Sequence, residues 1–189
     1  MPLEIEIKLK VGSHDAVRAA LKLAKAVFVR TVLETNTFFD RPDRSLRKAN
    51  TGLRVRMEKV LTGQPKPGDA LLTFKGPPQT TGLRSREAFD LTVSPPEQIV
   101  PLIAALGFEQ VLCFEKRRES WLLGGCHVEL DHMPDAGLFV EIEGPSESVI
   151  AAVRQTLDLV AANVVHESYS AMMAKLAAAH PDWRGVVRL

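Results

Sequence analysis

The chain has 189 residues, of which 46% are hydrophobic and 25% charged, and its formal net charge at pH 7 is +1. This length and composition are typical of one soluble globular domain, and the near-neutral charge excludes long-range attraction to nucleic acid or to an anionic membrane. The two cysteines, Cys113 and Cys126, form neither a disulfide framework nor a metal-knuckle spacing. We recognise no secretory leader and no apolar run of membrane-spanning length, so we expect a cytoplasmic protein.

Alternation of apolar and polar residues predicts eight β-strands, joined mostly by turns that contain glycine or proline. We expect them at residues 3–11, 33–40, 52–60, 70–75, 84–93, 111–122, 126–131 and 138–143. Such turns favour antiparallel hairpins over crossover connections. Helical spacing predicts four helices, at 14–26, 95–107, 147–159 and 167–179. Ser94 and Glu97 have the spacing of a capping box at the start of the second helix. We expect a single domain over 1–178, followed by a C-terminal tail over 179–189.

The charged residues of each predicted strand share one face, because side chains two positions apart project to the same side. Like charges recur in pairs at this spacing: Glu4 with Glu6, Arg54 with Arg56, Arg84 with Arg86, Lys116 with Arg118, Glu129 with Asp131, and Glu141 with Glu143. Two architectures accommodate this pattern. An open sheet would leave the charged face in water, whereas a closed barrel of eight strands would turn it into the lumen.

The pairing of like charges favours the barrel, because such pairs repel unless a group of opposite charge lies between them. Pairs of acids suit hard divalent cations such as Mg²⁺ or Mn²⁺, and pairs of Arg and Lys suit phosphate oxygens. The pattern therefore predicts a site for a polyphosphate together with its metal ions.

Seven short motifs occur in one order along the chain: E-x-E-x-K at Glu4 to Lys8, L-R-x-R at Leu53 to Arg56, T-x-K-G-P at Thr73 to Pro77, S-R-E at Ser85 to Glu87, E-K-x-R at Glu115 to Arg118, E-L-D at Glu129 to Asp131, and E-I-E at Glu141 to Glu143. In this order and spacing they resemble the CYTH superfamily of triphosphate tunnel metalloenzymes. That superfamily includes class IV adenylyl cyclases, thiamine triphosphatases and inorganic triphosphatases.

The resemblance implies an α+β fold dominated by β structure, namely a closed eight-stranded antiparallel barrel with helices packed on its outside. It also implies Mg²⁺ or Mn²⁺ as cofactor, held by Glu4, Glu6, Glu129, Asp131, Glu141 and Glu143. The triphosphate would be bound by Lys8, Arg54, Arg56, Lys75, Arg86, Lys116 and Arg118. Lys8 is the candidate catalytic residue as well, because neighbouring cations would lower its pKa and make it a base or a group that positions water.

The stretches LLTFKGP, SREAFDLTV and FEKRRE look most similar to class IV adenylyl cyclases, so we first expect conversion of ATP to cyclic AMP and pyrophosphate. A triphosphatase acting on inorganic, thiamine or nucleoside triphosphate is the alternative, because no adenine pocket can be recognised in the sequence. A non-catalytic binder of polyphosphate or of an RNA 5′-triphosphate is an alternative of another class. Extended nucleic acid and membrane partners are not expected. Members of the resembled family often form homodimers, so a homodimer is a further expectation.

Overall fold

The computed structural model describes residues 3–64, 68–78, 84–183 and 185–189, and the side chains of residues 3, 4, 84 and 85 lie outside this description. All eight predicted strands are present as β1 (Leu3–Val11), β2 (Val27–Asp40), β3 (Gly52–Gly63), β4 (Ala70–Lys75), β5 (Arg84–Val93), β6 (Glu109–Leu123), β7 (Cys126–Met133) and β8 (Gly137–Gly144). Two short strands, β9 (Asn163–Val164) and β10 (Val186–Val187), were not predicted. β9 pairs with β1, and β10 pairs with β6. Because β10 lies within the expected tail over 179–189, part of that tail joins the sheet.

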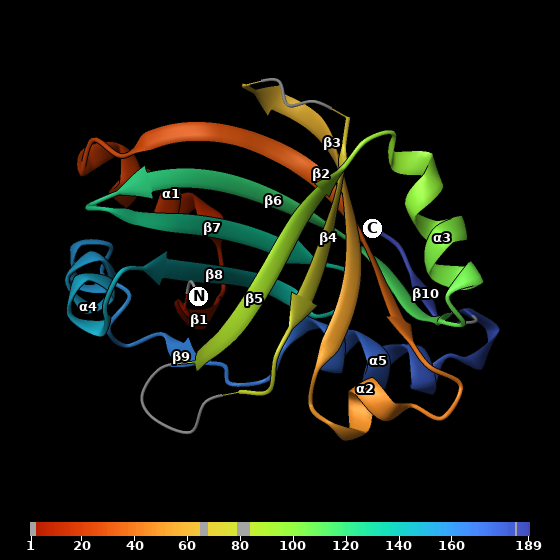
Figure 1. Ribbon diagram of the computed structural model, residues 1–189. Helices are drawn as coiled ribbons and strands as arrows, with labels where there is room; N and C mark the ends of the chain where they lie inside the picture. Colours follow the sequence, from red (N-terminus) through yellow and green to blue (C-terminus); the bar gives the residue numbers. More distant parts are fainter. Residues whose placement is uncertain (1–2, 65–67, 79–83, 184) are drawn as a thin grey trace.

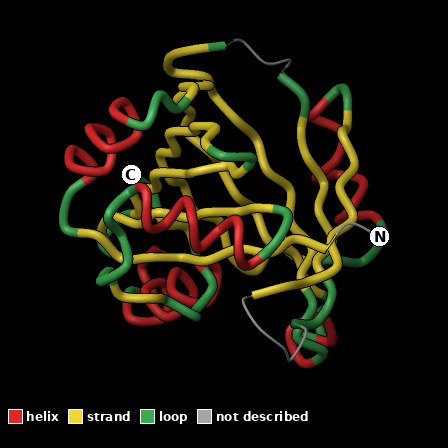
Figure 2. The backbone as a smooth tube through the Cα atoms, turned by 90° about the vertical axis from the view of Figure 1, so that its left-hand side faces the viewer, coloured by secondary structure: helices red, strands yellow, loops and turns green. Residues whose placement is uncertain are grey.

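The strands form one strongly curved sheet in the order β10-β6-β2-β3-β4-β5-β1-β8-β7, and β6 additionally pairs with β7 (Figures 1 and 2). The eight long strands pair antiparallel, as the turns predict, and only β10 is parallel to its neighbour. The mostly antiparallel architecture with helices is therefore confirmed. The closed barrel is not confirmed and stays a prediction.

Two apolar clusters cover the outer face of the sheet. In the first, α1 (His14–Leu23) and α4 (Glu147–Thr156) bury Val17, Leu21, Ile150 and Val153 against outward residues of β1, β7 and β8 such as Leu9, Val128 and Ile142. In the second, α3 (Ile99–Ala105) buries Ile99 and Ile103 against Phe39, Val55 and Ala70. These are the alternate residues that the period-two pattern assigns to the apolar face.

The helix α5 (Tyr169–Ala179) differs from the expectation that helices pack only on the outside. Its buried residues Tyr169, Met173 and Ala177 contact a third cluster that includes Leu112, Phe114, Met133 and Phe139. These strand residues lie two or four positions from Lys116, Asp131 and Glu141, so they share the inner, charged face. The end of the inner face next to α5 is therefore filled by apolar side chains, and the charged residues occupy the part beyond it.

The beginning of α3 differs from the sequence prediction. A short 3₁₀ helix, η1 (Pro96–Gln98), precedes α3. The N-cap residue of η1 is Pro95, which has no side-chain hydrogen bond, so the capping box of Ser94 and Glu97 does not form. Gly107 follows α3 with a φ of 83°, as expected for a glycine that ends a helix. The remaining elements are short: α2 (Ser45–Lys48) and a 3₁₀ turn, η2 (Pro181–Trp183). Within the described residues, no helix has the length and hydropathy that crossing a membrane requires.

Candidate active site

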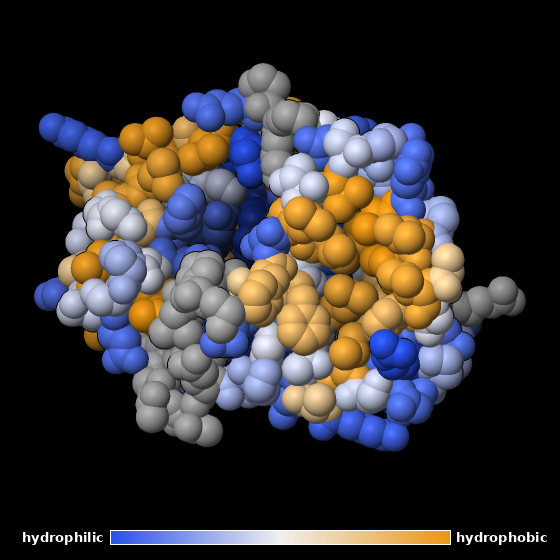
Figure 3. Space-filling view, in the orientation of Figure 1, coloured by the Kyte–Doolittle hydropathy of each residue, from blue (hydrophilic) through white to orange (hydrophobic). Residues whose placement is uncertain are grey.

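The predicted basic residues of β1, β3 and β6 are brought together with predicted acids of β7 and β8 on the inner face of the sheet. Lys8 has a side-chain exposure of 1%, and its Nζ lies 3.5 Å from Glu141 Oε1 and donates to the backbone oxygen of Glu167 over 2.9 Å. Strand register explains the first contact, because Lys8 lies directly opposite Glu141 on the neighbouring strand. In Figure 3 a hydrophilic hollow opens between two hydrophobic regions of the surface.

Arg118 lies at the centre of the ion-pair network. Its Nε and Nη2 donate to the two carboxylate oxygens of Asp131 over 2.7 and 2.6 Å, and Nη2 also contacts Glu141 Oε2 at 2.6 Å. Burial disfavours the charge on Arg118, but Asp131 and Glu34 more than offset this and raise its pKa. The Asp131 carboxyl, which is fully buried, has a lowered pKa because Arg118 and Lys116 outweigh the effect of burial. Both groups are therefore charged at neutral pH.

Glu34 on β2 is a member of this network that the sequence analysis missed. Its carboxylate lies 3.2 Å from Arg56 Nη1 and 3.4 Å from Lys116 Nζ. Burial would raise the pKa of Glu34, but Arg56, Lys116 and Arg118 lower it to about 2. The neighbouring Asn36 accepts a hydrogen bond from Arg56 Nε at 3.0 Å. A signal was available in the stretch LETNTFFD, where Glu34 and Asn36 are polar residues two positions apart.

Arg54 belongs to a chain of polar contacts across β3, β4 and β5. Its Nη2 donates to Thr73 Oγ1 over 3.0 Å, and Thr73 in turn donates to Asp90 Oδ1 over 2.6 Å. Burial and the neighbouring Arg56 lower the pKa of Arg54 to about 9. The Nε atom of Arg54 is buried without a hydrogen-bond partner. This guanidinium therefore has a donor available for an anionic ligand.

The remaining predicted residues have other neighbours on their strands. Arg86 donates to the backbone oxygens of Asn50 and Gly76 over 3.2 and 3.5 Å. Lys75 is in register with Gly52 and Ala88 and is only partly buried. Glu6 pairs in register with the exposed Glu143. Glu4 pairs in register with Arg86, and its side chain lies outside the described residues.

The predicted metal ligands fit a hard divalent cation by chemistry, because all of them are carboxylates. Glu129 and Glu141 lie opposite each other on β7 and β8. Glu129 accepts a hydrogen bond from Ser120 Oγ at 2.6 Å, and burial raises its pKa. Among the residues that the structure describes, no three acids, histidines or cysteines are arranged as ligands of one ion. The acids of this site are instead paired with Arg118, Lys116 and Lys8.

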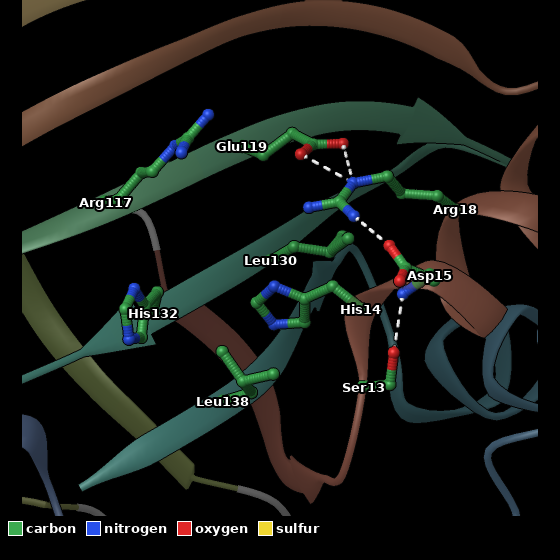
Figure 4. Close-up of a pocket in the computed structure, with 9 residues that line it drawn as sticks. All are labelled: Ser13, His14, Asp15, Arg18, Arg117, Glu119, Leu130, His132 and Leu138. Carbon is green, nitrogen blue, oxygen red and sulfur yellow. Dashed lines mark hydrogen bonds and ion pairs between the residues drawn. The ribbon is translucent and has the colours of Figure 1, made fainter. Parts of the chain in front are cut away.

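A separate pocket of about 210 Å³ lies on the outer face, between α1 and strands β6 to β8 (Figure 4). His14 is buried there and its Nε2 lies 3.0 Å from the backbone oxygen of Phe139, an arrangement in which the ring donates. Burial lowers the pKa of His14. Arg18 is already paired with Glu119 and Asp15. The lining contains none of the predicted site residues, so the inner face remains the candidate active site.

Solved structures share this fold. The PH1819 protein from Pyrococcus horikoshii OT3 superposes with a TM-score of 0.76 at 21% identity, covering 92% of this chain and 99% of that one. HpAC1 from Hippeastrum, described with a dominant triphosphatase activity, superposes with a TM-score of 0.66 at 16% identity, covering 89% of this chain and 93% of that one.

Two sequence comparisons define the family. Adenylate cyclase CyaB of Aeromonas hydrophila is 31% identical over 157 residues, which are 82% of this chain and 76% of that protein. The family model described as "CYTH domain" matches residues 2–165. Since this match spans most of the chain and contains all the predicted site residues, the protein belongs to the CYTH domain family.

Proposed function

We propose that this protein is a divalent-metal-dependent enzyme that acts on a triphosphate bound at the inner face of the sheet. The observation that carries the proposal is the buried cluster in which Lys8, Arg56, Lys116 and Arg118 surround the carboxylates of Glu34, Asp131 and Glu141. So many buried charges are costly to maintain for stability alone. They are useful where phosphate oxygens and a cation have to be bound away from water.

The basic side chains would spread charge away from the phosphate oxygens, and Arg118 can do so with two donors at once. Because Arg118 is paired with Asp131 and Glu141, a triphosphate that draws the guanidinium to itself leaves both carboxylates available to a cation. A bound Mg²⁺ or Mn²⁺ supplies neutralisation of phosphate charge and activation of the attacking hydroxyl or water. The other acids proposed to hold it are Glu4, Glu6, Glu129 and Glu143. Lys8, next to Glu141, is proposed to orient the attacking group.

We propose conversion of ATP to cyclic AMP and pyrophosphate as the first candidate reaction, because the relative from Aeromonas hydrophila is named adenylate cyclase. Hydrolysis of a triphosphate is the second candidate. One observation favours it: Phe39 and Phe139, two aromatic residues that could stack on an adenine if they were accessible, are buried in apolar clusters, with exposed fractions of 4% and 1%. HpAC1, the Hippeastrum protein that shares the fold, is described with triphosphatase activity.

The test is to incubate the purified protein with Mg²⁺ or Mn²⁺ and either ATP or inorganic triphosphate, and to resolve all products by chromatography. Cyclic AMP with pyrophosphate supports the cyclase, and orthophosphate without cyclic nucleotide supports the triphosphatase. We expect Glu141→Gln to lower turnover at least a hundredfold while triphosphate binding is largely retained. Glu97→Gln, at an exposed position on η1, is the matched control and should leave turnover unchanged. Full turnover by Glu141→Gln would contradict the assignment of the acids to the cation.

A further inference from the structure

Tyr169, the only tyrosine in the chain, is the first residue of α5 and forms a wall of the charged site. Its exposed fraction is 9%. The ring packs edge-on against Phe139, with 5.5 Å between the ring centroids. Lys8 Nζ lies 3.8 Å and Lys116 Nζ 4.9 Å from the centroid of the tyrosine ring. One side of this ring therefore belongs to the apolar cluster of α5, and the other contacts two lysines proposed to bind phosphate.

The hydroxyl of Tyr169 is buried next to the Asp131 carboxylate, with which it interacts, but it forms no hydrogen bond of good geometry. The hydroxyl keeps its proton at neutral pH, because the ordinary pKa of a tyrosine is about 10. A buried donor whose hydrogen bond is poorly aligned is unfavourable, and a ligand oxygen in line with the O–H bond would complete it. The hydroxyl is thus a donor at the inner end of the site, next to Lys8 and Lys116.

The position of α5 limits how far a phosphate chain can extend. Met173 and Ala177 follow Tyr169 on the same side of the helix and are buried with Leu112 and Met133 in the inner apolar cluster. The start of α5 is fixed by Ser168, whose Oγ accepts from the backbone nitrogen of Ala171 over 3.1 Å. Lys8 also donates to the backbone oxygen of Glu167, just before the helix. A chain of phosphates that enters among the charged residues therefore meets Tyr169 as its end wall.

We infer that the Tyr169 hydroxyl donates a hydrogen bond to an oxygen of the terminal phosphate, so that the site binds linear phosphate chains by a free end. This inference rests on the proposed function. Lys8 and Lys116 supply positive charge there, whereas the hydroxyl supplies a directional donor that recognises the end group. A cyclic phosphate, which has no terminal group, lacks the oxygen that the hydroxyl would recognise.

A single tyrosine permits a direct spectroscopic test, because protein labelled with ¹³C at the tyrosine ζ carbon gives one resonance. We expect sodium tripolyphosphate, added without metal, to shift this resonance, and cyclic trimetaphosphate to leave it in place. Tyr169→Phe keeps the ring and removes only the hydroxyl. By calorimetry it should bind tripolyphosphate about tenfold or more weakly, since a hydrogen bond to a charged group is lost. Met173→Leu, on the same helix, is the matched control and should keep the affinity of the unmodified protein.

The outcomes separate this inference from the proposed function. If the unmodified protein binds and turns over a triphosphate while Tyr169→Phe binds it equally well and the resonance does not move, the role of Tyr169 is overturned and the proposed function stands. An equal response to tripolyphosphate and trimetaphosphate likewise overturns recognition of the free end. If neither tripolyphosphate nor ATP binds, with or without Mg²⁺, the proposed function fails and this inference fails with it.

Discussion

Glu34 is the acid on which two of the buried cations depend. It contacts Arg56 and Lys116 and is itself only 1% exposed. Replacing it by Gln keeps the shape but leaves those cations with less compensating charge, and breaking a buried pair in this way costs about 3 kcal/mol. We expect Glu34→Gln to lower the free energy of unfolding by about this amount at pH 7, measured by denaturant titration. The pair of Glu109 with Arg44 is exposed, so Glu109→Gln should cost less than about 1 kcal/mol.

The pH dependence of stability follows from the same residue. The pKa of Glu34 is lowered from 4.5 to about 2 on folding, so its contribution is present above pH 4.5 and is lost as the pH falls toward 2. The stability of the unmodified protein should therefore decline over that interval, and the difference between it and Glu34→Gln should shrink. A difference that stays constant from pH 7 to 2.5 would contradict the pKa shift.

Residues of the site were predictable from sequence where like charges repeat at a spacing of two on one strand. Arg54 with Arg56 and Lys116 with Arg118 are such pairs, and strand geometry alone places both members on one face. Glu34 was missed because its neighbour two positions on is Asn36, which breaks the pattern of paired charges. Tyr169 was missed for another reason: it reaches the inner face from a helix, and no local pattern shows where a helix docks.

Helix starts in this protein depend on individual serine side chains. Ser13 Oγ accepts from the backbone nitrogen of Asp15 over 3.0 Å at the start of α1, whereas Ser94 forms no corresponding cap before η1 and α3. Removing an N-cap hydroxyl typically costs about 1 kcal/mol. We expect Ser13→Ala to lower the free energy of unfolding by about that amount and Ser94→Ala to leave it unchanged within error. Equal losses for the two variants in parallel denaturant titrations would show that these contacts do not decide helix stability.

All eight long strands were predicted, but the accuracy of their bounds does not follow the length of the pattern. Strands β1, β4 and β5 begin and end where the alternation predicts, and β2 begins six residues earlier than expected. The two-residue strands β9 and β10 carry too few positions for a periodic signal. The expected helix after Ser94 fits a helical pattern throughout, yet its first turn is 3₁₀ and the capping box does not form. Spacing alone does not show whether a capping side chain reaches the backbone.

At the scale of the whole molecule, several residues of the charged face are buried but part of the apolar outer face is exposed. The small helix α3 covers only a portion of the outer side of β3 to β5. Phe89 and Leu91 on β5 are 52% and 61% exposed, and Leu102 and Leu106, at α3 and its end, are 56% and 62% exposed. Figure 3 shows hydrophobic surface over this region. Monomeric proteins rarely leave large contiguous apolar patches in water, so this surface is the best candidate for an interface between two copies.

We therefore predict a homodimer that buries the patch of Phe89, Leu91, Leu102 and Leu106. Sedimentation equilibrium at micromolar concentrations should give about twice the chain mass of 20.8 kDa. Leu91→Lys places a charge in the middle of the patch, where burying it without a partner is strongly unfavourable, and should yield monomers. Leu23→Lys, which adds the same charge at a residue of α1 that is 86% exposed, should remain dimeric. Because the charged site lies on the opposite face of the sheet, the Leu91→Lys monomer should keep its affinity for triphosphate, whereas a monomeric unmodified protein would contradict the predicted interface.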